Sequence, residues 1–323
     1  MATILPARSP QPVPLSPDSS VETLKGEFDA MRKDLDEQLR GEHFLDIQEG
    51  FKPMKILFLS SDTGGGHRAS AESLANQFTI HFPGCTFDIL DIWKDDGIWP
   101  YNQAIETYKF MSANPNHWRL FYHVTNSKVV KPVMTWHATV SCENNIRKRI
   151  ESYDPDLVVS VHPMMNHAPI RACRKIARAH NKHIPFYTVI TDLASAHGLW
   201  FEKGVDKLYL ASESLYSIAR NGVGVPKEKI VKTGLPIRHD FAVQARKLGN
   251  RNDENGKAYQ RHVKRLLGLS DDKPMLLVMG GGEGTLNNSL LTTKDKWEGS
   301  QKRDMHWQVL VGLTRLSMNC TLL

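Results

Sequence analysis

From residue 54 to about residue 245, short β-rich runs alternate with segments of helical spacing, and this alternation constrains the fold more than any other feature. Lys55–Ser60 (KILFLS) is an almost continuous apolar run, as expected for a strand that is covered on both faces. The pattern predicts a parallel, doubly wound α/β sheet. The predicted strands are Lys55–Ser60, Thr86–Ile92, Asp156–Val161, Ile184–Ile190, Lys207–Ala211, Lys229–Thr233 and Pro274–Met279. The predicted helices include Ala69–Phe78, Asn166–His180, Glu213–Asn221 and Ala258–Leu267.

The first 50 residues differ in composition from the rest of the chain. They hold 5 Lys/Arg against 10 Asp/Glu, whereas the whole chain has a net charge of +6, so the remainder is strongly basic. Five prolines between positions 6 and 17 favour an extended segment, and Val21–Leu45 then has roughly helical spacing. Transit peptides are usually poor in acidic residues, so we expect an acidic leader that stays in the mature protein. It is either a solvated tail or a site for a specific partner.

Composition excludes several classes of protein. The longest apolar runs, such as Ile56–Leu59 and Met275–Met279, fall far below the roughly 18 residues that a membrane span needs, so any membrane contact is expected to be peripheral. The four cysteines are scattered and form no CxxC pair, so neither a disulfide framework nor a structural zinc site is expected. The basic body suits anionic lipid, nucleotide phosphate or nucleic acid, but there is no nucleic-acid recognition motif.

The segment Ser60–Ser70 (SSDTGGGHRAS) is the strongest local candidate for a site. It connects a predicted strand to a predicted helix, at the sheet edge where open α/β sheets bind their ligands. Gly64, Gly65 and Gly66 allow close approach of the backbone to a ligand, and the following helix N-terminus favours an anion. The loop matches neither GxGxxG nor a Walker A sequence, and its alternative interpretation is a tight turn.

A histidine next to this loop and a second glycine loop are further candidates for a site. His67 directly follows the glycines, where a neutral imidazole can remove a proton from a hydroxyl near pH 7 or can simply cap the helix. A second glycine loop, Gly280–Gly284, follows the predicted strand Pro274–Met279. Two such loops in successive α/β units indicate two nucleotide-binding halves that face a cleft, although an ordinary turn is the alternative for each.

Several segments together resemble plant monogalactosyldiacylglycerol synthases, which are glycosyltransferases of the GT-B architecture. The resemblance covers about residues 51–284 and runs through motifs that occur in the same order. These motifs are Lys55–Ala71, Asp91–Asn102 (DIWKDDGIWPYN), Pro155–Pro169 (PDLVVSVHPMMNHAP), Thr188–Trp200 (TVITDLASAHGLW), Gly234–Arg238 (GLPIR) and Leu276–Gly284 (LLVMGGGEG). The resemblance implies transfer of galactose from UDP-galactose to 1,2-diacylglycerol, with inversion at the anomeric carbon. Such a displacement requires a base for the acceptor hydroxyl and a stabilised leaving group.

The resemblance also implies roles for particular residues. His67 would be the base, and Asp192, at the end of a predicted strand, would orient or charge-stabilise it, or else cap the next helix. Pro100 and Trp200 would contact the acceptor or an anionic lipid, although core packing is the alternative for the tryptophan. Arg238 would pair with a donor phosphate or remain solvated. The expected donor and phosphate contacts are Gly64, Gly65, Gly66, Arg238, Gly281, Gly282 and Glu283.

The family further implies partners and a location. Diacylglycerol, UDP-galactose and an activating anionic lipid are the expected ligands, with no metal and no cofactor. His162 and His167 lack a third ligand at metal spacing, which fits that expectation. The expected location is the chloroplast envelope, most readily its outer membrane, as a peripheral protein that forms a homodimer.

These expectations divide the chain into five parts. Residues 1–50 are the leader, 51–245 the acceptor-binding Rossmann-like domain, and 246–269 a linker with a connecting helix. Residues 270–284 give the first strand and glycine loop of a donor domain, and 285–323 form a tail without strand–helix alternation. One strand cannot complete a sheet. We therefore expect this chain to be inactive or weakly active, and a non-catalytic lipid-binding or regulatory fragment is the alternative.

Overall fold

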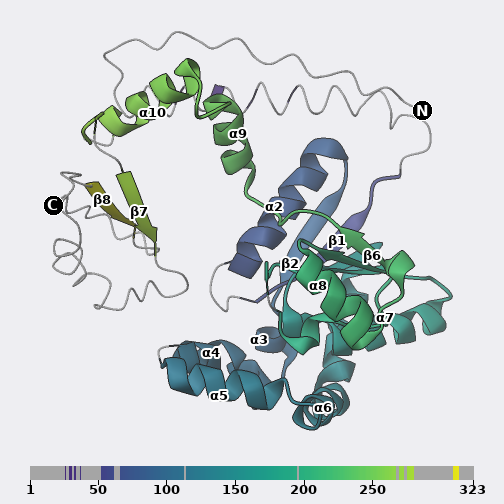
Figure 1. Ribbon diagram of the computed structural model, residues 1–323. Helices are drawn as coiled ribbons and strands as arrows, with labels where there is room; N and C mark the ends of the chain where they lie inside the picture. Colours follow the sequence, from purple (N-terminus) through teal and green to yellow (C-terminus); the bar gives the residue numbers. More distant parts are fainter. Residues whose placement is uncertain are drawn as a thin grey trace.

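The computed structural model describes residues 52–61, 66–112, 114–194, 196–266, 269–272, 275–279 and 308–312, together with five positions in the leader (Figure 1). Those five positions, between Gly26 and Glu37, are helical, in agreement with the helix predicted within Val21–Leu45. The rest of the leader, Gly64, Gly65 and the loop Gly280–Gly284 lie outside the described residues.

A six-stranded, wholly parallel sheet forms the centre of the main domain. Its strands are β1 (Lys55–Leu59), β2 (Thr86–Leu90), β3 (Leu157–Ser160), β4 (Phe186–Val189), β5 (Lys207–Leu210) and β6 (Ile230–Lys232). Their order in the sheet is β2-β1-β3-β4-β5-β6. The chain moves outward from β1 to β2 and then returns to β3 on the other side of β1, which creates a topological switch point between β1 and β3. This topology confirms the predicted doubly wound α/β fold.

Helices cover both faces of the sheet (Figure 1). Those of the main domain are α2 (Gly66–His81), α3 (Ile92–Asp96), α4 (Ala104–Ser112), α5 (Pro115–Thr125), α6 (Val130–Tyr153), α7 (His167–His180) and α8 (Glu213–Ser217). A π-helical turn, Ile218–Val223, continues α8. Side chains that alternate along a strand point to opposite faces of the sheet. Accordingly, Ile56 and Phe58 of β1 pack with Ala71 and Ala75 of α2. Leu57 and Leu59 point to the other face, where they belong to the core cluster that includes residues of α6, α7 and α8.

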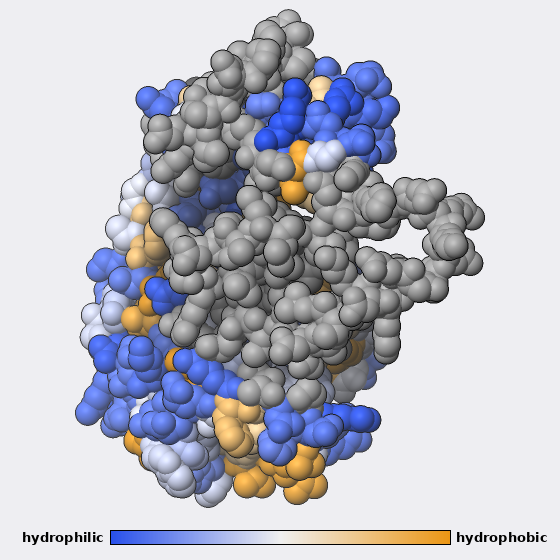
Figure 2. Space-filling model, turned by 90° about the vertical axis from the view of Figure 1, so that its left-hand side faces the viewer, coloured by the Kyte–Doolittle hydropathy of each residue, from blue (hydrophilic) through white to orange (hydrophobic). Residues whose placement is uncertain are grey.

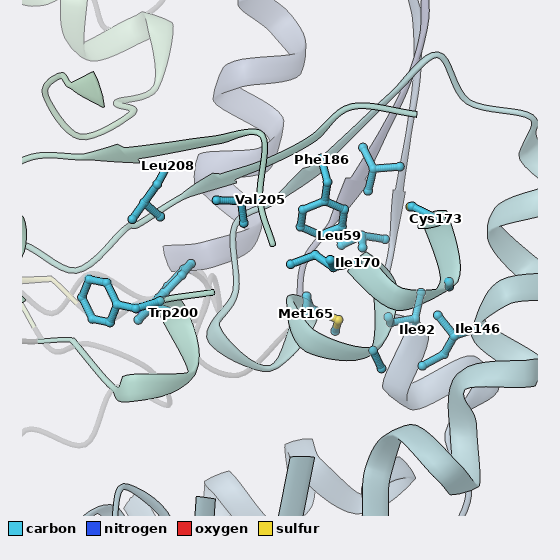
Figure 3. Close-up of a cluster of buried hydrophobic side chains, with 14 of the residues drawn as sticks. Leu59, Ile92, Ile146, Met165, Ile170, Cys173, Phe186, Trp200, Val205 and Leu208 are labelled. Atoms are coloured by element: carbon cyan, nitrogen blue, oxygen red, sulfur yellow. The ribbon is translucent and has the colours of Figure 1, made fainter. Parts of the chain in front are cut away.

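The larger core lies on the α6–α7 face of the sheet. Figure 3 shows how Leu59 and Phe186 from the strands meet Ile146 of α6 and Ile170 of α7. All four are buried, and Ile146 is entirely inaccessible to solvent. Buried aliphatic side chains of this size each stabilise the fold by roughly 1.5–3 kcal/mol, so this layer is the main apolar contribution that fixes the sheet edge.

Two connections differ from the expected pattern. The region between β2 and β3 contains the four helices α3 to α6, none of which was predicted as a helix from the sequence. In the segment 246–269, predicted as a linker with a connecting helix, α9 (His239–Leu248) extends into the first residues, and α10 (Glu254–Leu266) begins four residues before the predicted helix Ala258–Leu267. Asp253 Oδ1 accepts a hydrogen bond of 2.7 Å from Gly256 N, which caps α10. Lys, Arg and Glu are good helix formers, so the first turn of α10 and the end of α9 form without an apolar pattern that would predict them.

A second, two-stranded parallel sheet follows α10. It pairs β7 (Met275–Met279) with β8 (Gln308–Gly312), in the register Met275↔Gln308. The strand predicted at Pro274–Met279 is therefore confirmed. Residues 285–323, expected to be a tail without strand–helix alternation, contribute the strand β8 to this sheet.

Candidate active site

The candidate site lies at the carboxyl edge of the sheet, beside the switch point between β1 and β3. Three connections meet there: the loop from β1 into α2, the segment from β3 into α7, and the segment that follows β4. His67 is the second residue of α2, and Val161 and Thr191 follow β3 and β4. The topology therefore brings together residues that are more than 90 positions apart in the sequence.

His67 is held through one of its two ring nitrogens. Its Nδ1 lies 3.0 Å from the carbonyl oxygen of Val161 and 2.8 Å from Oγ1 of Thr191. A carbonyl oxygen can only accept a hydrogen bond, so Nδ1 is assigned as the protonated donor. In the neutral ring the lone pair then belongs to Nε2, which is the nitrogen available to act as a base.

The surroundings of His67 favour its neutral form. Burial lowers the pKa of His67 below its ordinary value, while the charge of Asp192 and the hydrogen bond to Val161 act in the opposite direction. The ring of His162 meets the ring of His67 edge-on, with 4.6 Å between centroids. Burial, with the neighbouring His67, holds the pKa of His162 well below its usual range. Both imidazoles are therefore neutral near pH 7, and His67 is ready to accept a proton.

Asp192 acts on His67 through its charge and is itself held by a tryptophan. Asp192 Oδ2 accepts a hydrogen bond of 2.7 Å from Nε1 of Trp200, and the Trp200 and His67 rings lie 5.9 Å apart. The alternative role of Asp192 as a helix cap is wrong, because the next helical turn, Gly198–Trp200, is capped by the side chain of His197. Charge stabilisation of a protonated His67 is the role that the geometry supports.

Trp200 differs from its expected role. Its side chain is completely buried, so the interpretation of its indole as an interfacial lipid contact is wrong. The physical reason is its hydrogen bond to Asp192, which holds the polar edge of the ring inside the site while the apolar part joins the core. Pro100 lies on the surface, beside Trp99, whose side chain is 77% exposed. Pro100 thus remains accessible, and its contact with a ligand stays a prediction.

The expected phosphate contacts are only partly visible. Gly66 begins α2, and a Cβ added there would meet no atom within 4 Å, so packing of the described residues does not require glycine at this position. Arg238 is exposed at the start of α9 and has no ion-pair partner among the described residues. The Ser73 hydroxyl of α2 donates a hydrogen bond to the carbonyl of Ile237, which places Arg238 next to the helix that carries His67. Gly64, Gly65, Gly281, Gly282 and Glu283 lie outside the described residues.

Sequence reasoning missed three contributors to the site. Thr191 contacts His67 directly, and His162 was considered only as a metal ligand. Asn166 is fully buried and joins two loops, because its Nδ2 donates to the carbonyls of His162 and Leu199 while its Oδ1 accepts from Thr188. His162 and Thr191 each stand two residues after a strand end, and that position in a doubly wound sheet was the available signal. Among the described residues there is no cluster of three or more His, Cys, Asp or Glu side chains that could hold a metal ion.

An exposed apolar surface covers the helical end of the domain. Helices α4, α5 and α6 lie together at the lower end of Figure 1, and hydrophobic atoms gather at the same end in Figure 2. On α6 the exposed residues recur at helical spacing and so share one face. The surface, named here the α4–α6 surface, consists of Phe110, Leu120, Val124, Val129, Val133, Trp136 and Val140. In the described part of the chain, no helix has the length and apolar character needed to cross a bilayer. Contiguous exposed apolar surface of this kind marks a protein or membrane contact.

The fold and the site together define a class of protein. It is a doubly wound α/β domain with a neutral histidine at the switch point, a carboxylate that supports the protonated form of that histidine, and an apolar surface on the helices beside it. A neutral imidazole in such a position is able to accept a proton from a bound ligand.

Comparison with known families identifies the group to which the chain belongs. Residues 67–237 match the family model described as Monogalactosyldiacylglycerol (MGDG) synthase. This match covers more than half of the chain and includes the switch-point residues described above. The chain belongs to the monogalactosyldiacylglycerol synthase family.

Individual relatives agree with this assignment. The chain is 36% identical over 238 residues to the probable chloroplastic monogalactosyldiacylglycerol synthase of Glycine max, covering 73% of this chain and 42% of that protein. It is 34% identical over 238 residues to monogalactosyldiacylglycerol synthase 1 of Arabidopsis thaliana, with the same coverage. The chain thus spans less than half the length of these relatives. Among solved structures, MurG of Acinetobacter baumannii aligns with a TM-score of 0.42 and 14% identity, over 81% of this chain and 59% of MurG.

Proposed function

We propose that this chain supplies the acceptor side of an inverting transfer of galactose from UDP-galactose to 1,2-diacylglycerol. The observation that carries the proposal is the arrangement of His67, whose Nδ1 is engaged by Val161 and Thr191 and whose Nε2 has no hydrogen-bond partner among the residues that the structure describes, so that it can serve as the base. The printed names of the relatives, all monogalactosyldiacylglycerol synthases, support the choice of product.

In the proposed step, Nε2 of His67 removes the proton of the diacylglycerol hydroxyl. The hydroxyl oxygen forms a bond to the anomeric carbon of galactose, and the bond from that carbon to the UDP oxygen breaks with its electron pair leaving on UDP. His67 becomes positively charged, and the negative charge of Asp192 and the Val161 carbonyl stabilise this form. General base catalysis of this type contributes typically 10²–10⁴-fold to a rate.

The donor would be held by groups near α2. Backbone N–H groups of Gly64, Gly65 and Gly66 at the start of that helix suit a diphosphate, and Arg238 stands beside the same helix. Gly281, Gly282 and Glu283 of the second loop would complete the donor site by resemblance. In this scheme no cofactor or metal takes part, and an anionic lipid acts as an activator.

The acceptor would be reached from a membrane surface. Diacylglycerol is confined to membranes, and the α4–α6 surface offers exposed apolar side chains that can enter the interfacial region. Exposed cations such as Lys128 and Arg119 border this surface, which suits anionic lipids. Together with the chloroplastic names of the relatives, this surface supports peripheral attachment to a chloroplast membrane, and we further propose that the protein is a homodimer at the outer envelope.

The test is a transfer assay with the full chain, radiolabelled UDP-galactose and vesicles that contain diacylglycerol. The expected result is slow formation of labelled monogalactosyldiacylglycerol that falls at least about 100-fold in His67→Gln, since the amide cannot take the proton. Unchanged turnover in His67→Gln would contradict the role of the histidine.

A second candidate function is lipid binding without catalysis, as a regulatory module. The observation in its favour is the α4–α6 surface, which needs no donor in order to bind a membrane. It predicts vesicle binding by the wild-type chain with no labelled product in the same assay. Product that depends on His67 would reject it.

A further inference from the structure

A basic groove lies beside α7, away from the crevice of His67. It has a volume of about 440 Å³ and runs between the first turns of α7 and the segment Phe201–Gly204. His167, Ile170, Arg171 and Arg174 share one face of α7 because they are spaced by three and four residues. Lys131 of α6 and Val223 of the π-helical turn complete the lining.

The segment Phe201–Gly204 lies unusually close to α7 because residue 204 is a glycine. A Cβ added to Gly204 would lie 2.8 Å from Nη2 of Arg174 and 2.9 Å from Cγ2 of Ile170. The absence of a side chain there lets Arg174 Nη2 donate a hydrogen bond of 3.2 Å to the Gly204 carbonyl. Glycine at 204 therefore holds the arginine against this wall and keeps the groove in a defined shape.

The charges in the groove are unbalanced. Four cations line it, and its single carboxylate, Glu202, already accepts a hydrogen bond of 3.1 Å from Nδ1 of His167. Two of the cations are fixed by backbone carbonyls: Arg174 as described, and Lys131, whose Nζ donates to the Gly198 carbonyl at 3.3 Å. Arg171 and Lys203 are exposed, and neither has a carboxylate partner among the described residues.

The groove is a separate place from the proposed active site. His67, His162 and Asp192 do not line it. The groove and the proposed active site are connected through the chain: Phe201, which lines the groove, directly follows Trp200, whose indole donates a hydrogen bond to Asp192. A ligand in the groove would thus lie one residue from the side chain that holds the carboxylate beside His67.

We propose that this groove binds a phosphate-bearing ligand, either the headgroup of a phospholipid or a soluble phosphate compound. Two arginines on one helix face can each offer paired N–H donors to phosphate oxygens, and the adjacent N-terminus of α7 adds a favourable dipole. The excess of positive charge suits a group with more than one negative charge. If the ligand is a phospholipid headgroup, this groove is where the anionic-lipid activator of the proposed function binds, and the inference then rests on that function. In either case it does not depend on the role of His67.

The experiment uses the full chain with two probes, inorganic diphosphate and phosphatidylcholine vesicles with or without phosphatidic acid. The test variant is Arg171→Glu with Lys203→Glu, and the control is Arg178→Glu with Lys148→Glu, which makes the same total charge change at two exposed cations on α7 and α6 that do not line the groove. We expect the test variant to weaken binding of at least one probe at least tenfold and the control to change it less than twofold. Raising the salt concentration should weaken wild-type binding.

The two probes distinguish the sources of the phosphate. Diphosphate binding without any preference for phosphatidic acid identifies a soluble ligand, and a preference for phosphatidic acid that the test variant loses identifies a lipid headgroup. A parallel variant, Arg171→Gln with Lys203→Gln, removes the two cations without adding carboxylates. It should weaken binding of the same probe that the test variant binds weakly. The proposal is overturned if the wild type binds neither probe, or if the test and control variants bind equally.

Discussion

The chemistry proposed for His67 follows from a few contacts to the two segments that follow β3 and β4. The Val161 carbonyl fixes the tautomer, the Thr191 hydroxyl fixes the ring, and the buried ring of His162 lies edge-on to it. Asp192 adds a charge without a direct hydrogen bond to the ring. The sequence indicated His67 and Asp192 from their places after strands. It did not indicate the partners, because Val161 acts through its backbone and His162 is recognisable only once β1 and β3 are adjacent.

Replacing Asp192 should move the pKa of His67 in a known direction. The charge of Asp192 raises the pKa of His67 against the effect of burial, so Asp192→Asn should lower that pKa further below its ordinary value. A pH titration of the His67 ring signals by NMR measures the change. The control is Asp88→Asn on the exposed edge strand β2, which should leave the titration unchanged. A rise in the pKa of His67 in Asp192→Asn would contradict the charge-stabilising role.

A second histidine should make the fold sensitive to acid. Burial, with the nearby charge of Lys131, lowers the pKa of His197 to about 4. The unfolded chain binds a proton at this residue near pH 6.5, so the stability that His197 contributes is present above pH 6.5 and is lost as pH falls towards 4. Urea unfolding of wild type and His197→Gln at several pH values measures this. The wild type should lose more unfolding free energy than the variant between pH 6.5 and 4, and equal losses would contradict the account.

At the scale of elements, apolar runs predicted the strands more reliably than periodicity predicted the helices. All seven predicted strands are present. The inner strands β1 and β3 are buried on both faces and so leave short continuous apolar runs, whereas the edge strands β2 and β6 are less buried. The sequence pattern did not give the bounds of the helices between β2 and β3. The longest of them, α6, is apolar on two sides. Its inner face packs on the sheet while its outer face forms part of the α4–α6 surface, so the two patterns overlap in the sequence.

The two faces of α6 should differ sharply in their contribution to stability. Ile146 is fully buried, so Ile146→Ala should cost about 2–5 kcal/mol of unfolding free energy through lost contacts and the cavity left behind. Val140 is 68% exposed on the other face, and Val140→Ala should change that free energy by no more than about 0.5 kcal/mol. Urea denaturation measures both variants. Similar costs at the two positions would mean that the faces of α6 are wrongly assigned.

At the scale of the whole molecule, one domain combines a proton acceptor with a surface suited to lipid. The sheet topology places His67 at the switch point, and the helices inserted after β2 carry the exposed apolar side chains at one end of the same domain (Figures 1 and 2). The class of fold and the position of the site were predictable from the sequence, since both depend on strand order along the chain. The exposed apolar α4–α6 surface was not, because exposed and buried apolar residues look alike in a sequence.

The central claim is that His67 meets a lipid hydroxyl delivered at the membrane surface. The most direct measurement is the NMR signal of the His67 Nε2 nitrogen, recorded with phosphatidylcholine nanodiscs that contain or lack diacylglycerol. We expect a saturable change in this signal only with diacylglycerol, and we expect the change to be lost in Trp136→Asp, which places a charge on the α4–α6 surface. A His67 signal that is identical with both kinds of nanodisc, under conditions where the chain binds them, would contradict the account.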